Sequence, residues 1–388
     1  MRFYSIKHVF MIFLFSFSLL SLYGGFTNAA FKDTRSQDYQ WGPSKALLEH
    51  KNPYDLYKDW LDGKIPKPYK MSQAPNYPAS AYIFLWPYAS MSWDNARLFW
   101  AISNIIFTVL ILIGLIRLFP IKRLDLQLLI IMLFIAGSAW RTTIGSGQHG
   151  LFALAFFIWA IIIANKSELL SGFFLSIAWF KYTITFPLSL FFLYRKNYKT
   201  LLVSAVIHII LTLFVSYWID QPVTQFFFGS VQIAINLPGF GDIDIFSIIQ
   251  RYDLPVYMAV CLGSILLAMV IAVGFHYQKK ECNELLILSF LSLISLTLFF
   301  HLHYDFILLI FPLWLLFSSD ILNKYSGYLV IWLVILNWYF VSVAFHLVRK
   351  FEYPIVLSFD YLLTLSIIII SYLVLVSIYR RITVDEVT

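Results

Sequence analysis

Long apolar runs separated by short polar segments make up most of the chain. Many of these runs approach or exceed the roughly 20 residues that an α-helix needs to cross a bilayer. They are continuous rather than alternating, which favours helices over half-buried strands. The pattern therefore predicts an all-α polytopic membrane protein with about twelve transmembrane helices. The predicted spans are residues 9–29, 94–119, 126–140, 150–164, 169–180, 183–194, 201–218, 255–275, 285–300, 306–317, 328–345 and 355–379.

Two apolar segments allow other interpretations. The first run follows Arg2 and Lys7, and residues 27–29 resemble the cleavage site of a signal peptide. Its length favours a retained span, and both interpretations place the next segment outside. Residues 78–91 are short for a span and are interrupted by Pro87, so we expect a re-entrant or interfacial segment there.

Two long polar segments interrupt the pattern. Residues 31–77 are the longest and carry eight Lys and Arg residues, and residues 219–254 are the second. If both chain ends lie inside, both segments are outer loops, and most of the remaining cations fall on the inner side, as the positive-inside rule requires. We therefore expect one integral-membrane domain over residues 1–388, with a long first outer loop.

Composition agrees with a membrane protein. Of 388 residues, 60% are apolar and 13% are charged, whereas a soluble domain has about 45–50% and about 25%. The net charge of +7 comes largely from loop cations that set membrane orientation, so it does not indicate nucleic-acid binding. The two cysteines, Cys261 and Cys282, are placed in a way that suggests neither a disulfide nor a metal site.

Ionisable residues gather at the predicted outer face, where such groups are costly and are usually explained by function. No comparable set of acids and histidines lies on the inner side. The outer set comprises Asp33 and Asp38 after the first run, Arg141, Gln148 and His149 around a glycine-containing turn, Lys181 between two apolar runs, Asp242, Asp244 and Arg251 in the second loop, and His301, His303 and Asp305.

Each member of this set also has a purely structural interpretation. Either aspartate of the first loop could cap a helix, Lys181 could extend to the outer headgroups, and the histidines could be interfacial. His301 and Asp305 are four residues apart and could pair on one helix face. Together with His303 they could bind zinc, but His301 and His303 would point apart on a helix, so we expect no metal.

The common depth of these groups indicates one chemistry. Lys181, Arg141 and Arg251, together with histidine, could hold the phosphate of an outer-leaflet lipid. A facing carboxylate could deprotonate an acceptor hydroxyl that displaces this phosphate from a sugar carbon. No nucleotide-binding fold is evident, so we expect neither a soluble nucleotide-sugar donor nor a cofactor.

Several short motifs occur in an order that is typical of a known family. They are Asp38-Tyr39, Ala46-Leu47-Leu48 and Asn52-Pro53-Tyr54-Asp55 in the first loop, then Tyr77-Pro78, Trp86-Pro87, Ala96 to Trp100, Gly147-Gln148, Lys181, Ser247 to Arg251 and His301 to Tyr304. This ordered set resembles glycosyltransferase family 87, which belongs to the GT-C superfamily of integral-membrane enzymes. The departures are Ala79 in a Tyr-Pro-Pro segment, Tyr182 where a proline usually follows the lysine, and Leu302 between the paired histidines.

The resemblance implies an inverting transfer of a sugar, commonly mannose, from a polyprenyl-phosphate donor to an acceptor hydroxyl on the outer face. Asp38 would be the general base, with Asp33 as the second candidate. By the same resemblance, Lys181 and His303 would hold the donor phosphate.

The complete predicted donor site is larger. The resemblance places Gln148 in the pocket for the sugar or phosphate, so the predicted donor site includes Gln148 and both histidines. Two arginines are added to this site on electrostatic grounds. Its members are Lys181, His303, His301, Gln148, Arg141 and Arg251.

Two other functions are open at this stage. A transporter or lipid flippase would also be polytopic, but would carry polar residues along a path at mid-depth. A structural or assembly protein would leave the clustered ionisable groups without a purpose. We expect a glycosyltransferase of a bacterial inner membrane that acts on a glycolipid or glycan at the periplasmic or extracellular face.

Overall fold

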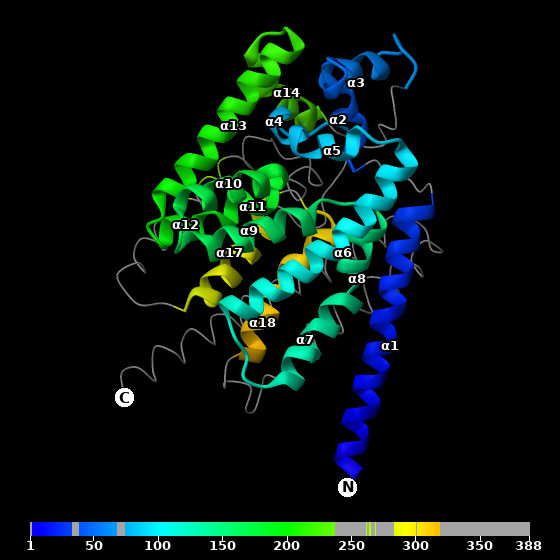
Figure 1. Ribbon diagram of the computed structural model, residues 1–388, viewed down its shortest axis with the longest axis vertical. Helices are drawn as coiled ribbons and strands as arrows, with labels where there is room; N and C mark the ends of the chain where they lie inside the picture. The colour runs from blue at the N-terminus through cyan, green and yellow to red at the C-terminus, as the bar shows by residue number, and fades with distance from the viewer. Residues whose placement is uncertain are drawn as a thin grey trace.

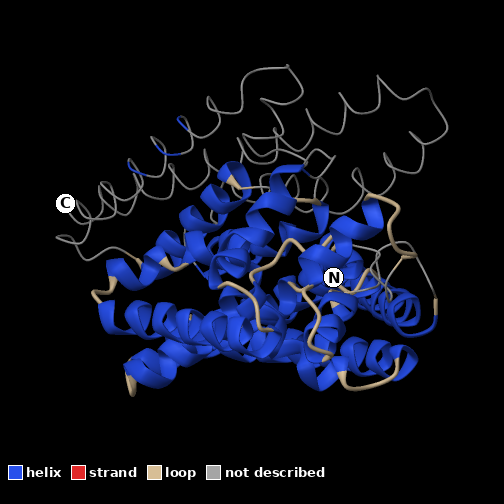
Figure 2. Cartoon of the chain, turned by 90° about the horizontal axis from the view of Figure 1, so that it is seen from above, coloured by secondary structure: helices blue, strands red, loops and turns tan. Residues whose placement is uncertain are grey.

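The computed structural model of the protein describes residues 2–32, 39–67, 74–236, 283–299 and 301–318, together with positions 261, 264 and 268. Within these residues all regular structure is helical and there is no strand (Figure 2). The all-α prediction is therefore confirmed for this part of the chain. Helix labels follow Figure 1.

The N-terminal helix α1 (Arg2–Phe31) packs along α6 (Trp93–Leu118), α7 (Leu124–Ala136) and α8 (Ser138–Gly145). Two hydroxyls tie α1 to α7, because Ser18 Oγ donates to the Met132 carbonyl at 3.0 Å and Ser21 Oγ to the Ala136 carbonyl at 3.3 Å. These bonds fix the position of α1 along α7.

The predicted span over residues 126–140 is wrong as a single straight helix. It breaks at Gly137, whose φ of −58° and ψ of 137° are not helical, and α7 and α8 meet there at 51°. The break directs α8 toward α1, where the Arg141 carbonyl lies 3.3 Å from the position of a Cβ on Gly25. A glycine on α1 thus permits the close approach.

The chain reverses direction after α9 (Gly150–Ala164). Residues Glu168–Leu188 are apolar enough to count as one 21-residue crossing, but they comprise α10 (Glu168–Ala178), η2 (Trp179–Lys181) and α11 (Tyr182–Leu188), with α12 (Leu190–Tyr194) following. Ser171 and Arg195 both hydrogen-bond to carbonyls near the end of α9, those of Ala160 and Ile161, although they are far apart in the chain. The chain therefore turns between Ser171 and Arg195, and the non-helical backbone of Lys181 lies within this stretch. That residues 169–180 and 183–194 are two separate spans stays a prediction.

Helix α13 (Tyr198–Ile219) completes this layer by packing on α10. The contact is close, since a Cβ on Gly172 would lie 2.8 Å from the Thr200 carbonyl. Further along the chain, α17 (Glu284–Leu298), η3 (His303–Leu309) and α18 (Ile310–Ser318) pack on one another. Helix α17 also packs on α11, η3 on α8 and α9, and α18 on α7.

Four described helices are long and apolar enough to cross a membrane, or five if the bent α7–α8 pair is one crossing. They are His8–Phe31, Trp93–Leu118, Glu168–Leu188 and Tyr198–Ile219; the shorter apolar helices are Gly150–Ala164, Glu284–Leu298 and His303–Ser318. The predicted spans 255–275, 328–345 and 355–379 lie outside the described residues apart from three isolated positions, so the count of about twelve stays a prediction.

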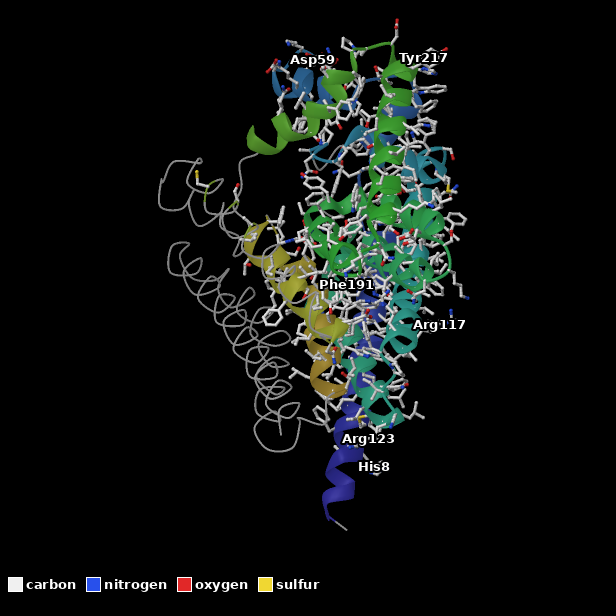
Figure 3. All side chains as sticks on the ribbon, turned by 90° about the vertical axis from the view of Figure 1, so that its left-hand side faces the viewer. His8, Asp59, Arg117, Arg123, Phe191 and Tyr217 are labelled. Atoms are coloured by element: carbon white, nitrogen blue, oxygen red, sulfur yellow. The ribbon has the colours of Figure 1, made fainter. Side chains whose placement is uncertain are left out.

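Short helices from both outer loops and from residues 78–91 gather at one end of the molecule (Figure 1). They are α2 (Trp41–Leu48), α3 (Pro53–Leu61), α4 (Ala79–Tyr82), η1 (Ile83–Leu85), α5 (Trp86–Ala89) and α14 (Val223–Asn236). Asp59 and Tyr217 lie at this end, and His8 and Arg123 lie at the opposite end (Figure 3). This arrangement agrees with the prediction that the two long loops share one side. As expected, residues 78–91 form short helical turns rather than a span.

Candidate active site

The centre of the site is a buried ion pair between Lys181 and Asp305. Lys181 Nζ lies 2.5 Å from Asp305 Oδ1, and the two side chains are only 4% and 3% exposed. His301 Nδ1 donates to the other carboxylate oxygen at 2.9 Å. The Tyr304 ring covers the ammonium, with its centroid 4.6 Å from Nζ. Burial of this cation is tolerable because charged and aromatic groups surround it.

Local backbone structure brings these residues together. Lys181 ends η2 with φ −101° and ψ 74°, so the backbone leaves helical geometry at the turn. Thr185 Oγ1 donates to the carbonyls of Ala178 and Lys181 and so ties α11 to the end of α10 across the break. Ser295 on α17 bridges the two halves of the site, because its Oγ donates to the Thr183 carbonyl at 3.0 Å and lies 3.2 Å from His301 Nε2.

The two predicted histidines face different helices. His303 Nε2 lies 2.8 Å from Ser138 Oγ on α8, whereas His301 faces α17 and Asp305. The predicted pairing of His301 with Asp305 is confirmed, but not on a helix face, because His301 precedes η3. Within the described ranges, no group of three His, Cys, Asp or Glu side chains could hold a metal ion.

A second group of residues surrounds His149 at the start of α9. Its Nε2 donates to the Tyr39 carbonyl at 2.7 Å, and its Nδ1 has no partner among the described residues. The ring lies 4.5 Å from that of Phe180, which precedes Lys181. Burial, and next the positive charge of Lys181, lower the pKa of His149 to about 3, although its bond to Tyr39 opposes this. His149 is therefore neutral at physiological pH.

The turn before His149 holds the first loop in place. Gly147 has a φ of +66°, a region that favours glycine, and its carbonyl accepts a hydrogen bond from Trp100 Nε1 at 3.0 Å. Trp100 stacks on Tyr39 with 5.2 Å between ring centroids. Tyr39, the residue that follows Asp38 in the chain, is thus packed against the Gly147–His149 turn.

The Asn-Pro-Tyr motif of the first loop reaches the same place. Asn52 caps α3 by accepting a hydrogen bond from the Tyr54 backbone N–H, and Pro53 occupies the first helical turn. The Tyr54 hydroxyl donates to the Tyr77 carbonyl at 2.7 Å, and the Tyr77 ring lies beside those of His149 and Phe180. Burial raises the pKa of Tyr54 well above its usual range, so the phenol stays protonated as a donor.

The structure brings together part of the predicted donor site. Lys181 and His301 meet at Asp305, His303 lies two residues before that carboxylate, and Gln148 is buried beside His149. Arg141 on α8 is exposed and does not share this buried environment. The alternative that Lys181 extends to the headgroups is wrong for this structure, because Asp305 holds its ammonium inside. Asp33, Asp38 and Arg251 lie outside the described residues.

Two charged residues make contacts that the sequence does not indicate. Asp305 belongs to the predicted outer set, but its bond to Lys181 joins positions 124 residues apart. Arg97 on α6 is buried, and its guanidinium donates to the carbonyls of Ala29 and Lys32 at the end of α1. An arginine inside an apolar span was the signal that could have identified it.

Comparison with known proteins identifies the class. The apolar helices and the buried polar centre define a membrane protein with a candidate catalytic site. A family model for glycosyltransferase family 87 matches residues 76–302, and the chain belongs to this family. It is therefore a membrane glycosyltransferase, which favours an enzyme over a transporter. The match includes Gln148, Lys181 and His301, and it excludes residues 31–75 of the first outer loop, His303 and Asp305. No curated protein and no solved structure matches the chain significantly.

Proposed function

We propose that this enzyme transfers a sugar, mannose or another hexose, from a polyprenyl-phosphate donor to an acceptor hydroxyl on the outer face of the membrane. The observation that carries the proposal is the convergence of the family's short motifs. Motifs from the first loop, the Tyr77 segment, the Gly147 turn, Lys181 and the histidine element are joined by direct contacts. These segments are far apart in the sequence, and a shared site explains why they meet.

In the proposed reaction, the acceptor oxygen attacks the anomeric carbon of the sugar on the face opposite the phosphate. The bond between that carbon and the phosphate oxygen breaks, so the configuration inverts. Asp38 takes the hydroxyl proton as general base, and Asp33 is the alternative. Support for Asp38 comes from its chain neighbour Tyr39, which is bonded to His149.

The leaving polyprenyl phosphate gains negative charge as the bond breaks. Lys181 is the cation that stabilises this charge, and His303 and His301 supply further hydrogen bonds. Gln148 lines the pocket for the sugar or phosphate. Arg141 and Arg251 are assigned to the outer edge of the site, where they attract the anionic donor. The acceptor is a glycolipid or a glycan, and the setting is a bacterial inner membrane.

A transfer assay tests this proposal. Purified protein in lipid vesicles receives radiolabelled polyprenyl-phosphate mannose, with polyprenyl-phosphate glucose and galactose as a panel, plus a membrane glycolipid extract as acceptor. We expect label to move into lipid or glycan with wild type and to be lost in Asp38→Asn. Equal transfer by Asp38→Asn would remove Asp38 from the mechanism, and silence across the panel would refute the donor class.

A further inference from the structure

The proposed function leaves one feature of the site unexplained. The ammonium that should hold the donor phosphate is already engaged, because Asp305 binds Lys181 at 2.5 Å and both side chains are almost completely buried. The carboxylate uses both oxygens, one for Lys181 and one for His301. A carboxylate in this position occupies the same two donors that a phosphate would use.

From this geometry, and resting on the proposed function, we propose that Asp305 is an exchangeable counter-ion whose place the lipid phosphate takes. A buried ammonium is costly without an anion, so Asp305 keeps Lys181 charged whenever no lipid phosphate is bound. When the donor binds, its phosphate oxygens replace Asp305 on Lys181. The Tyr304 ring keeps its contact with the ammonium. Asp305 is thus a positioning residue that sets how tightly the site holds lipid phosphate.

The different charges of donor and product give Asp305 a second role in the proposed reaction. The donor is a phosphodiester with a single negative charge, and the product, polyprenyl phosphate, is a monoester that carries about −1.5 to −2 at neutral pH. Repulsion from the nearby carboxylate therefore acts more strongly on the product than on the donor. Asp305 accordingly favours release of the spent lipid carrier after each transfer.

The chain offers a matched control for this inference. Glu284 on α17 is bound by Arg195 through two hydrogen bonds of 2.7 Å and 2.6 Å, so it is also a carboxylate paired with a cation. No described contact joins this pair to Lys181 or to the histidines. Loss of its charge should not affect lipid-phosphate binding.

The experiment measures binding of a short-chain polyprenyl phosphate to the detergent-purified full chain, together with product inhibition in the transfer assay. Asp305→Asn should bind the lipid phosphate about tenfold more tightly, lower KM for the donor, and lower kcat because release slows. Glu284→Gln and Asp305→Glu should keep wild-type affinity. A purely structural role for Asp305 would not lower KM and kcat together.

Folded Asp305→Asn protein that binds polyprenyl phosphate with wild-type or weaker affinity would overturn the inference. If this variant does not fold, Asp305→Ser removes the same charge and is tested in its place. If wild-type protein transfers the sugar and Asp305→Asn binds polyprenyl phosphate with unchanged affinity, only the role proposed for Asp305 is refuted. Wild-type protein that neither transfers from the donors nor binds polyprenyl phosphate refutes the proposed function as well.

Discussion

The Lys181–Asp305 pair makes a prediction about folding that can be worked from its geometry. Its partners are 2.5 Å apart and only 4% and 3% exposed, so removal of one partner leaves the other charge buried. Breaking a buried pair in this way costs about 3–5 kcal/mol, whereas removal of both partners is often nearly neutral. The loss of unfolding free energy for Lys181→Met should lie at the lower end of this range, about 3 kcal/mol, because His301 still binds Asp305.

The assay is a double-mutant cycle on unfolding free energy in mixed detergent micelles. Lys181→Met, Asp305→Asn and the double variant are compared with wild type. We expect the double variant to be more stable than the sum of the single effects by about 2–3 kcal/mol. Arg195 and Glu284 form a comparison pair, which is 15% and 36% exposed and should couple by about 1 kcal/mol or less. Additive effects at Lys181 and Asp305 would refute the claim that they form a buried pair.

Three further predictions concern the residues around the first loop. Arg97→Met removes the donors to two carbonyls at the end of α1, so it should lower the unfolding free energy by about 1–3 kcal/mol, speed amide exchange there and reduce sugar transfer. Arg117→Met on the same helix is the control and should leave transfer unchanged. Equal transfer by both variants would contradict this prediction. The pKa of His149 in the folded protein is about 3, below its ordinary value of 6.5. Between these two values the unfolded chain binds a proton that the folded chain excludes, so the unfolding free energy falls as the pH drops below about 6.5. His149→Phe should lose less stability over that range in acid unfolding titrations, and an unchanged pH slope would count against a buried neutral histidine. Gly147→Ala places a Cβ on a residue with φ +66°, 3.4 Å from the Tyr39 side chain, so it should destabilise the fold by about 1–2 kcal/mol and slow sugar transfer. A thermal unfolding curve that matches wild type would argue against a strained turn.

Much of the helical layout is visible in the sequence. The apolar run over residues 94–119 matches α6, and residues 150–164 match α9 to the residue, because uninterrupted apolar runs leave few other structures in a membrane. The break in helical geometry at Lys181 was also predictable, since a lone cation separates two apolar runs. The bend at Gly137 is not evident in the sequence because apolar residues continue on both sides, and it depends on how α8 packs against α1 and η3.

The candidate site was predictable in composition but not in connectivity. Sequence order placed Lys181, His301 and Asp305 in one inventory of ionisable groups. It could not show that Asp305 binds both Lys181 and His301, since those contacts depend on how α11 and α17 pack around Ser295. Arg141 was included on charge alone, and its exposure on α8 could not be read from the sequence.

A structure of the protein with bound polyprenyl phosphate would test the central claim most directly. Phosphate oxygens should lie within hydrogen-bond distance of Lys181 Nζ and a histidine, with Asp305 no longer bonded to Lys181. A lipid phosphate bound elsewhere, with the Lys181–Asp305 pair intact, would contradict both the assigned donor site and the exchange at Asp305.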